Sequence, residues 1–112
     1  MSKTERILKE LKKVLMDNIG ENLDDLILYG SRAKGNAHRN SDYDVVIVLK
    51  HDCSPEYKNS IKDICYDIAL KFNILFDTTI ISKDELNRTH VSILYLLEDA
   101  FSEGIHIREK MK

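Results

Sequence analysis

Two stretches decide the fold: residues 26–35, LILYGSRAKG, and residues 42–49, DYDVVIVL. The apolar run at the start of the first is too short for a helix, and Gly30 closes it, which predicts a buried strand that ends at Tyr29. The second stretch is rich in β-branched residues and becomes entirely apolar. That pattern is typical of a strand covered on both faces, and it places this strand at the centre of the sheet.

Helices and further strands are predicted around these two. Residues 4–18 carry apolar side chains at helical spacing, followed by Gly20 as a stop. Ser54 and Pro55 form a helix start, and this helix is expected to run to about Phe72. The remaining predicted elements are a strand over 74–81, a Ser-x-x-Glu capping box at 82–85, a helix over 91–103 and a short edge strand over 105–107. The pattern predicts an α/β (α+β) fold, a small mixed β-sheet flanked by helices, with residues 1–112 as a single domain.

Composition excludes several classes of protein. The chain has 112 residues, with 17 Lys+Arg against 19 Asp+Glu, a net charge of −2. No basic surplus favours sequence-independent binding to nucleic acid or an anionic membrane, so no direct nucleic-acid or membrane partner is expected. The first residues lack the apolar core of a secretory signal, and we expect a cytoplasmic protein. Cys53 and Cys65 have no metal-binding spacing and are expected to be free.

The chemistry is predicted at the start of the central strand. Asp42 and Asp44 alternate onto one face, about 6.6 Å apart along the chain. Carboxylates that share a face repel unless a proton or cation lies between them, and Mg²⁺ prefers such oxygen ligands. Mg²⁺ usually completes its shell with phosphate oxygens, which implies a nucleoside triphosphate. Gly30 and Ser31 are positioned to approach such a phosphate with backbone N–H groups and a hydroxyl.

Two further residues extend this predicted site. Asp77 is the carboxylate within the strand predicted over 74–81. If that strand lies next to the central one, Asp77 can share the metals or accept a proton from an attacking hydroxyl. Arg32 follows the phosphate turn and would add positive charge. Such a set is typical of an enzyme that transfers or hydrolyses phosphate esters.

The Gly-Ser pair, ten intervening residues and Asp-x-Asp resemble the signature of the DNA polymerase β-like nucleotidyltransferase superfamily, and specifically of its minimal nucleotidyltransferase (MNT) group. The resemblance covers most of the chain, including residues 28–35, 41–44, 76–77 and 103–105. It implies that Gly30 and Ser31 hold the nucleotide phosphates. It also implies that Asp42, Asp44 and Asp77 bind Mg²⁺ and act as the catalytic carboxylates.

The resemblance also implies a biological role. Members of the MNT group often act as antitoxins beside a HEPN-domain ribonuclease toxin, which they silence by transferring AMP from ATP to a toxin tyrosine. We therefore expect a Mg²⁺-dependent protein adenylyltransferase that assembles with such a toxin. One alternative is a non-catalytic binding module that neutralises a partner by contact. Another is a small-molecule nucleotidyltransferase, which the short chain disfavours because little material remains for an acceptor pocket.

Overall fold

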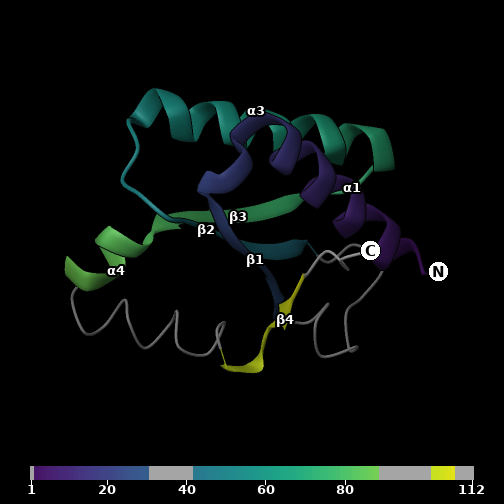
Figure 1. Cartoon of the computed structure of the whole chain (residues 1–112). Helices are drawn as coiled ribbons and strands as arrows, with labels where there is room; N and C mark the ends of the chain where they lie inside the picture. The colour runs from purple at the N-terminus through teal and green to yellow at the C-terminus, as the bar shows by residue number, and fades with distance from the viewer. Residues whose placement is uncertain (1, 31–41, 89–101, 108–112) are drawn as a thin grey trace.

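The computed structural model describes residues 2–30, 42–88 and 102–107. Four strands form one mixed sheet in the order β3-β2-β1-β4 (Figure 1). Their bounds are β1 Leu23–Tyr29, β2 Tyr43–Leu49, β3 Phe76–Ser82 and β4 Ile105–His106. β1 is antiparallel to both β2 and β4, whereas β2 and β3 are parallel. The predicted fold class, a small mixed sheet flanked by helices, is confirmed.

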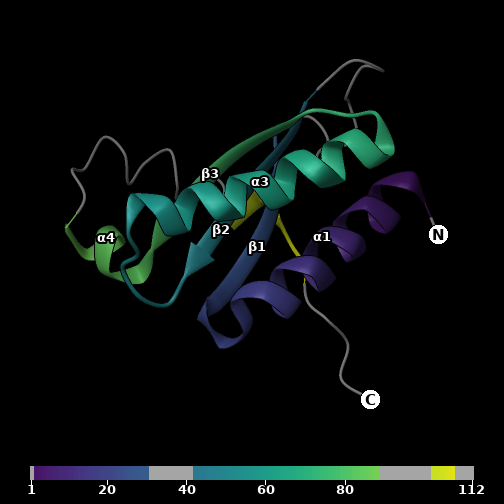
Figure 2. The ribbon, with the colours of Figure 1, turned by 90° about the horizontal axis from the view of Figure 1, so that it is seen from above.

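Two long helices cover one face of this sheet. α1 spans Lys3–Ile19 and α3 spans Pro55–Phe72, and the two lie side by side above the strands (Figures 1 and 2). A short 3-10 turn, η1 (Gly20–Asn22), leads from α1 into β1. The core between helices and sheet is made of apolar side chains that include Ile7, Leu11, Leu15, Leu26, Leu28, Val45, Ile47, Leu49, Ile61 and Cys65. Burial of this surface is the main force that holds the helices on the sheet.

The helix boundaries follow from local capping. Ser2 caps α1 in a capping box with Glu5, each side chain bonding the other residue's backbone N–H at 3.1 Å. Ser54 caps α3 by accepting the Tyr57 N–H at 3.1 Å, and Pro55 occupies the first helical position. The left-handed Asn73 closes α3. Both helices agree with the sequence prediction to within one residue.

The opposite face of the sheet carries a second, smaller apolar cluster. Its buried members are Ile27, Val46, Val48 and Ile81, with Tyr29 and Leu86 packed against them. Leu86 comes from α4 (Lys83–Arg88), which follows β3 directly. β2 therefore contributes buried side chains to both faces, as its apolar sequence predicts.

Strand bounds differ more from the prediction. β1 begins at Leu23, three residues earlier than predicted, because two polar residues at its start are paired rather than solvated. Asp24 forms an ion pair with Lys83 at 3.1 Å, and Asp25 Oδ2 lies 2.6 Å from His106 Nδ1 on β4. β3 begins two residues later than predicted, since Leu75 stays outside the strand while its carbonyl accepts the Tyr43 N–H at 2.9 Å.

The structure describes only some of the elements predicted after β3. The capping box predicted at 82–85 is present and opens α4. The edge strand is present as β4, beside β1. The helix predicted over 91–103 falls largely on residues 89–101, which lie outside the described residues. Cys53 and Cys65 are both free thiols, as expected. None of the helices in the described ranges is long and apolar enough to cross a membrane.

Candidate active site

The turn after β1 begins at Gly30, whose backbone φ is +76°. Glycine adopts this left-handed value readily, whereas a residue with a Cβ does not. The neighbouring side chain of Asp44 also requires glycine at this position. A Cβ placed on Gly30 would overlap Oδ2 of Asp44 and lie 3.3 Å from its Cγ. Gly30 therefore allows the end of β1 to lie directly against the Asp44 carboxylate.

The strand register places three side chains in one row across the sheet. Tyr29 on β1 pairs with Asp44 on β2, and Asp44 pairs with Asp77 on β3. Paired residues project to the same face of a sheet, and side chains two positions apart on one strand do so as well. Val46 belongs to the apolar cluster on the face away from α1 and α3. The row of Tyr29, Asp44 and Asp77 therefore lies on that face.

The pKa of Asp44 is raised by its surroundings. Burial, followed by the negative charges of Asp77 and Asp42 and a hydrogen bond with the Asp77 side chain, raises the pKa of Asp44. Each of these effects disfavours the ionised form of Asp44 when no cation is present. The register thus creates a pair of like charges that a bound proton or cation would stabilise.

Asp42 precedes β2 and is exposed. It lies two residues before Asp44, and its negative charge contributes to the raised pKa of Asp44. Within residues 2–30, 42–88 and 102–107, no three His, Cys, Asp or Glu side chains are grouped closely enough to hold a metal ion. The described structure therefore brings Asp44 and Asp77 together as a pair, and the charge of Asp42 acts on Asp44.

The donor chemistry of this pair fits the expected metal. Carboxylate oxygens are the ligands that Mg²⁺ prefers, and Mg²⁺ usually takes only one or two carboxylates from a protein, with waters and substrate phosphates completing its shell. A pair of adjacent carboxyl groups, one with its pKa raised by burial and by the charge of the other, is consistent with that requirement. The other predicted phosphate-binding residues, Ser31 and Arg32, lie outside the described residues.

Tyr29 is a site residue to which the sequence pattern assigns no role. Burial first, and then the charges of Asp44 and Asp77, raise the pKa of Tyr29, while a hydrogen bond with the Thr79 hydroxyl opposes this rise. To find Tyr29 from the sequence, one would have to know that the last residue of β1 pairs with Asp44. The length of the loop between the two strands does not reveal that register.

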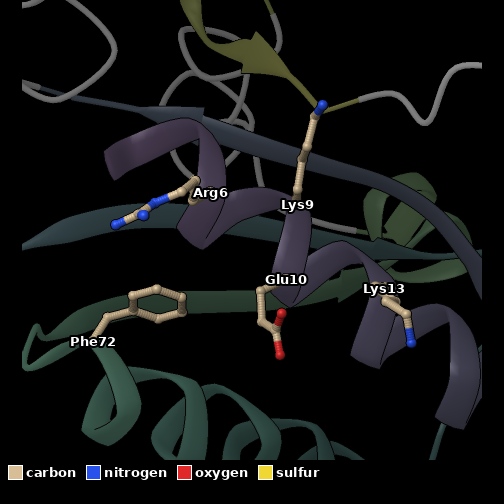
Figure 3. A pocket seen from close by; sticks show the side chains of 5 residues that line it. All are labelled: Arg6, Lys9, Glu10, Lys13 and Phe72. Carbon is tan, nitrogen blue, oxygen red and sulfur yellow. The ribbon is translucent and has the colours of Figure 1, made fainter. Parts of the chain in front are cut away.

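A separate hollow lies between α1 and α3, on the opposite side of the sheet. It is lined by Arg6, Lys9, Glu10, Lys13 and Phe72, and has a volume of about 480 Å³. Figure 3 shows that the three basic side chains extend in different directions rather than toward a common point. Glu10 is already paired with Lys71 at 3.0 Å. The hollow therefore lacks the converging charges that a phosphate site requires.

Comparison with known proteins assigns the chain to a family. The family model for the nucleotidyltransferase domain matches residues 5–107. The chain belongs to the nucleotidyltransferase domain family. A protein of Methanocaldococcus jannaschii that is named, by inference, a protein adenylyltransferase (MJ0141) is 36% identical over 77 residues, which cover 69% of this chain and 78% of that protein. The chain is accordingly a nucleotidyltransferase.

Solved structures share the fold. A toxin–antitoxin structure with AMP-PNP aligns with a TM-score of 0.66 at 20% identity, covering 96% of this chain and 74% of that one. The toxin–antitoxin pair MntA–HepT aligns with a TM-score of 0.61 at 16% identity, covering 95% and 73%. At these identities the likeness concerns the fold, a mixed sheet flanked by helices.

Proposed function

We propose that this chain transfers AMP from ATP to a tyrosine hydroxyl of a partner protein, a HEPN-domain ribonuclease toxin, and thereby acts as its antitoxin. The observation that carries the proposal is the alignment of Asp44 with Asp77 beside the end of β1 at Gly30. The family supplies the reaction class, nucleotidyl transfer. The similar archaeal protein named as a protein adenylyltransferase supports ATP as donor and a protein as acceptor.

Each residue of the site has a role in the proposed reaction. Gly30 and Ser31 bind the phosphates of ATP through backbone N–H groups and the Ser31 hydroxyl, and Arg32 adds positive charge. Asp44 and Asp77 would hold Mg²⁺, with Asp42 as a further ligand. When bound, Mg²⁺ neutralises charge on the phosphate oxygens. Gly30 keeps the backbone close to the carboxylates, so that phosphate and metal ligands are held at one edge of the sheet.

The transfer step requires a proton acceptor. The tyrosine oxygen of the partner forms a bond to the α-phosphorus, the bond from that phosphorus to the bridging oxygen of the β-phosphate breaks, and pyrophosphate leaves. A phenol with a pKa near 10 is a weak nucleophile at neutral pH until its proton is removed. Asp77, on β3 at the side of the pair away from β1, takes that proton.

The acceptor comes from another chain in this proposal. The structural neighbours are toxin–antitoxin complexes, one of them determined with AMP-PNP, an ATP analogue. Their composition supports a toxin as the partner of this chain. A contact-only antitoxin would not require two adjacent carboxylates beside a glycine turn, because uncompensated like charges destabilise the folded state.

The test is the intact mass of a toxin co-expressed with this chain. We expect the toxin mass to increase by whole AMP units with the wild-type chain and to stay unchanged with Asp77→Asn. Asp67→Asn, which alters an exposed carboxylate of α3, is the matched control and should modify the toxin like wild type. An unmodified but neutralised toxin in the wild-type sample would show instead that the chain acts by contact. Modification of a small molecule but not of the toxin would favour the other alternative.

A further inference from the structure

The strand β4 is short, and few backbone bonds hold it on β1. It consists of two residues, which pair with β1 in antiparallel register. Directly after the strand, the Ile107 N–H donates to the Leu26 carbonyl at 2.7 Å, and Lys12 Nζ of α1 donates to the Ile107 carbonyl at 2.8 Å. Each such bond contributes little net free energy, because water competes for the same groups. A strand of this length therefore depends on its side-chain contacts.

One of these contacts joins β4 to β1 through two ionisable side chains. His106 Nδ1 lies 2.6 Å from Asp25 Oδ2. His106 pairs with Ile27, and Asp25 stands two residues before Ile27, so both side chains project from the same face of the sheet. The other carboxylate oxygen, Asp25 Oδ1, accepts the Leu26 N–H at 2.9 Å. That bond fixes the carboxylate in place beside the ring.

The strength of this contact depends on whether His106 is protonated. A neutral ring can donate its Nδ1 proton to Asp25, whereas a protonated ring also forms an ion pair with the ionised carboxylate. The side chains of His106 and Asp25 are 26% and 22% exposed, so neither is fully removed from water. At such partial burial, the attraction of the carboxylate for the charged ring outweighs the cost of desolvating that ring.

The charged groups on the neighbouring elements do not replace Asp25 in this contact. Lys12 lies on α1, which covers the opposite face of the sheet, and it bonds the Ile107 carbonyl. Asp24, the neighbour of Asp25 on β1, is paired with Lys83 at 3.1 Å. Glu103 precedes β4 along the chain and is exposed. Asp25 is therefore the charged group from β1 that responds to protonation of His106.

We propose that Asp25 and His106 form a pH-sensitive latch, which holds β4 on β1 more firmly when His106 is protonated. The ring then binds its proton more tightly while β4 is docked than when β4 is detached. Docking is thus strongest below about pH 6.5, the ordinary pKa of histidine, and weakens as the pH rises through the higher pKa of the docked ring. The latch covers the edge of β1, the strand that leads to Gly30, and it operates whether or not the chain transfers AMP.

Amide hydrogen exchange at Ile107 measures the detachment of β4, because this N–H bonds the Leu26 carbonyl when β4 is docked. NMR on the full chain gives the protection factor of this amide, which corrects for the pH dependence of intrinsic exchange, and also the titration of the His106 ring. We expect the wild-type protection factor to fall several-fold from pH 6 to pH 8. A docked ring with a pKa one unit above that of the detached ring sets the limit at about tenfold.

Two neighbouring residues of β1 provide a matched pair of variants. Asp25→Asn keeps a group that can bond His106 but removes its charge. It should lower the pKa of the His106 ring by about one unit and make the Ile107 protection factor independent of pH between 6 and 8. Asp24→Asn makes the same change at a residue whose partner, Lys83, stays charged over this range, and it should behave like wild type. His106→Gln should also remove the pH dependence.

Three results would overturn this proposal: a His106 ring that titrates alike in wild type and Asp25→Asn, a wild-type protection factor equal at both pH values, or loss of the pH dependence in Asp24→Asn. Urea unfolding verifies that each variant is folded, and His106→Gln provides the same comparison if Asp25→Asn is not. The exchange measurement needs neither toxin nor nucleotide. A toxin left unmodified by the wild-type chain would therefore contradict the proposed function and leave the latch to be decided by exchange.

Discussion

Gly30 is subject to two constraints that experiment can separate. Its φ of +76° disfavours any Cβ, and the Asp44 carboxylate occupies the space that a Cβ would need. Gly20 has a positive φ of +53° but no atom within 4 Å of the position of an added Cβ. At both glycines a residue with a Cβ would be strained, but only Gly30 lies against the candidate site.

Gly30→Ala should therefore lower both stability and nucleotide binding. We expect its free energy of unfolding to fall by about 1–2 kcal/mol, the usual penalty for a left-handed residue with a Cβ. Mn²⁺–nucleotide binding should also weaken because Asp44 is displaced. Gly20→Ala should lose stability but keep this binding. Urea unfolding and a binding titration of both variants test the prediction, and equal binding by the two variants would contradict it.

Asp44 links the candidate site to stability through its raised pKa. The folded state holds the Asp44 proton more tightly than the unfolded chain does. Between the ordinary carboxyl pKa of about 3.9 and the raised folded value, the folded state binds more protons, so stability falls as pH rises. This loss of stability is complete above the pKa of Asp44 in the folded state. It is absent below the pKa values of both the folded and the unfolded state.

Asp44→Asn should consequently stabilise the metal-free protein at pH 7 while abolishing transfer. Its urea midpoint should exceed that of wild type at pH 7, and this difference should shrink as the pH is lowered toward 3. Asp67→Asn, at an exposed position on α3, should leave the midpoint within the small range typical of surface substitutions at both pH values. A lower midpoint for Asp44→Asn at pH 7 would contradict the pKa assignment.

At the scale of elements, the start of α4 is the most highly connected helix terminus in the described ranges. Ser82 is buried, and its Oγ accepts the Glu85 N–H at 3.0 Å and donates to Asp52 Oδ1 at 2.6 Å. Glu85 accepts the Ser82 N–H at 3.0 Å and is paired with Lys58 at 2.8 Å. These bonds connect the C-terminal end of β3 to α3 and to the segment after β2.

Ser82→Ala should lower the free energy of unfolding by about 2 kcal/mol, because it removes a helix cap and leaves Asp52 without its bond to Ser82. The exposed cap Ser54→Ala should lower it by only about 1 kcal/mol. Ser82 lies at the opposite end of β3 from Asp77, so Mn²⁺–nucleotide binding should not change. Urea unfolding compares the stability of the Ser82→Ala and Ser54→Ala variants. A loss of Mn²⁺–nucleotide binding in Ser82→Ala would contradict the expectation that the two ends of β3 act independently.

Elements were predictable where local signals agree with tertiary packing. The period of apolar residues predicts α1 and α3, and Ser82 with Glu85 predicts the start of α4. The start of β1 was not predictable, since Asp24 and Asp25 resemble loop residues until their partners Lys83 and His106 are known. Those partners lie more than fifty residues away, and no local pattern contains them.

At the scale of the whole molecule, the sheet topology gathers the candidate site at one edge. The antiparallel pairing of β1 with β2 puts the end of β1 beside the start of β2, and the parallel pairing of β2 with β3 adds the start of β3. Gly30, Asp44 and Asp77 occupy these three positions. The motif predicted all three residues. The pairing of β2 with β3 was stated only as the condition under which Asp77 would join the site. The place of Tyr29 beside Asp44 was not predictable, because it depends on the register of β1 against β2.

In the proposed reaction, this edge of the sheet transfers the adenylyl group, and not another part of ATP, to a partner protein. The test incubates purified toxin and the wild-type chain with Mg²⁺ and with ATP labelled either at the α- or at the γ-phosphate. We predict that label enters the toxin only from the α-labelled ATP, with release of pyrophosphate, and that Asp77→Asn abolishes it. Label entering from γ-labelled ATP, or no label in a toxin that is nevertheless neutralised, would contradict adenylyl transfer as the function of this chain.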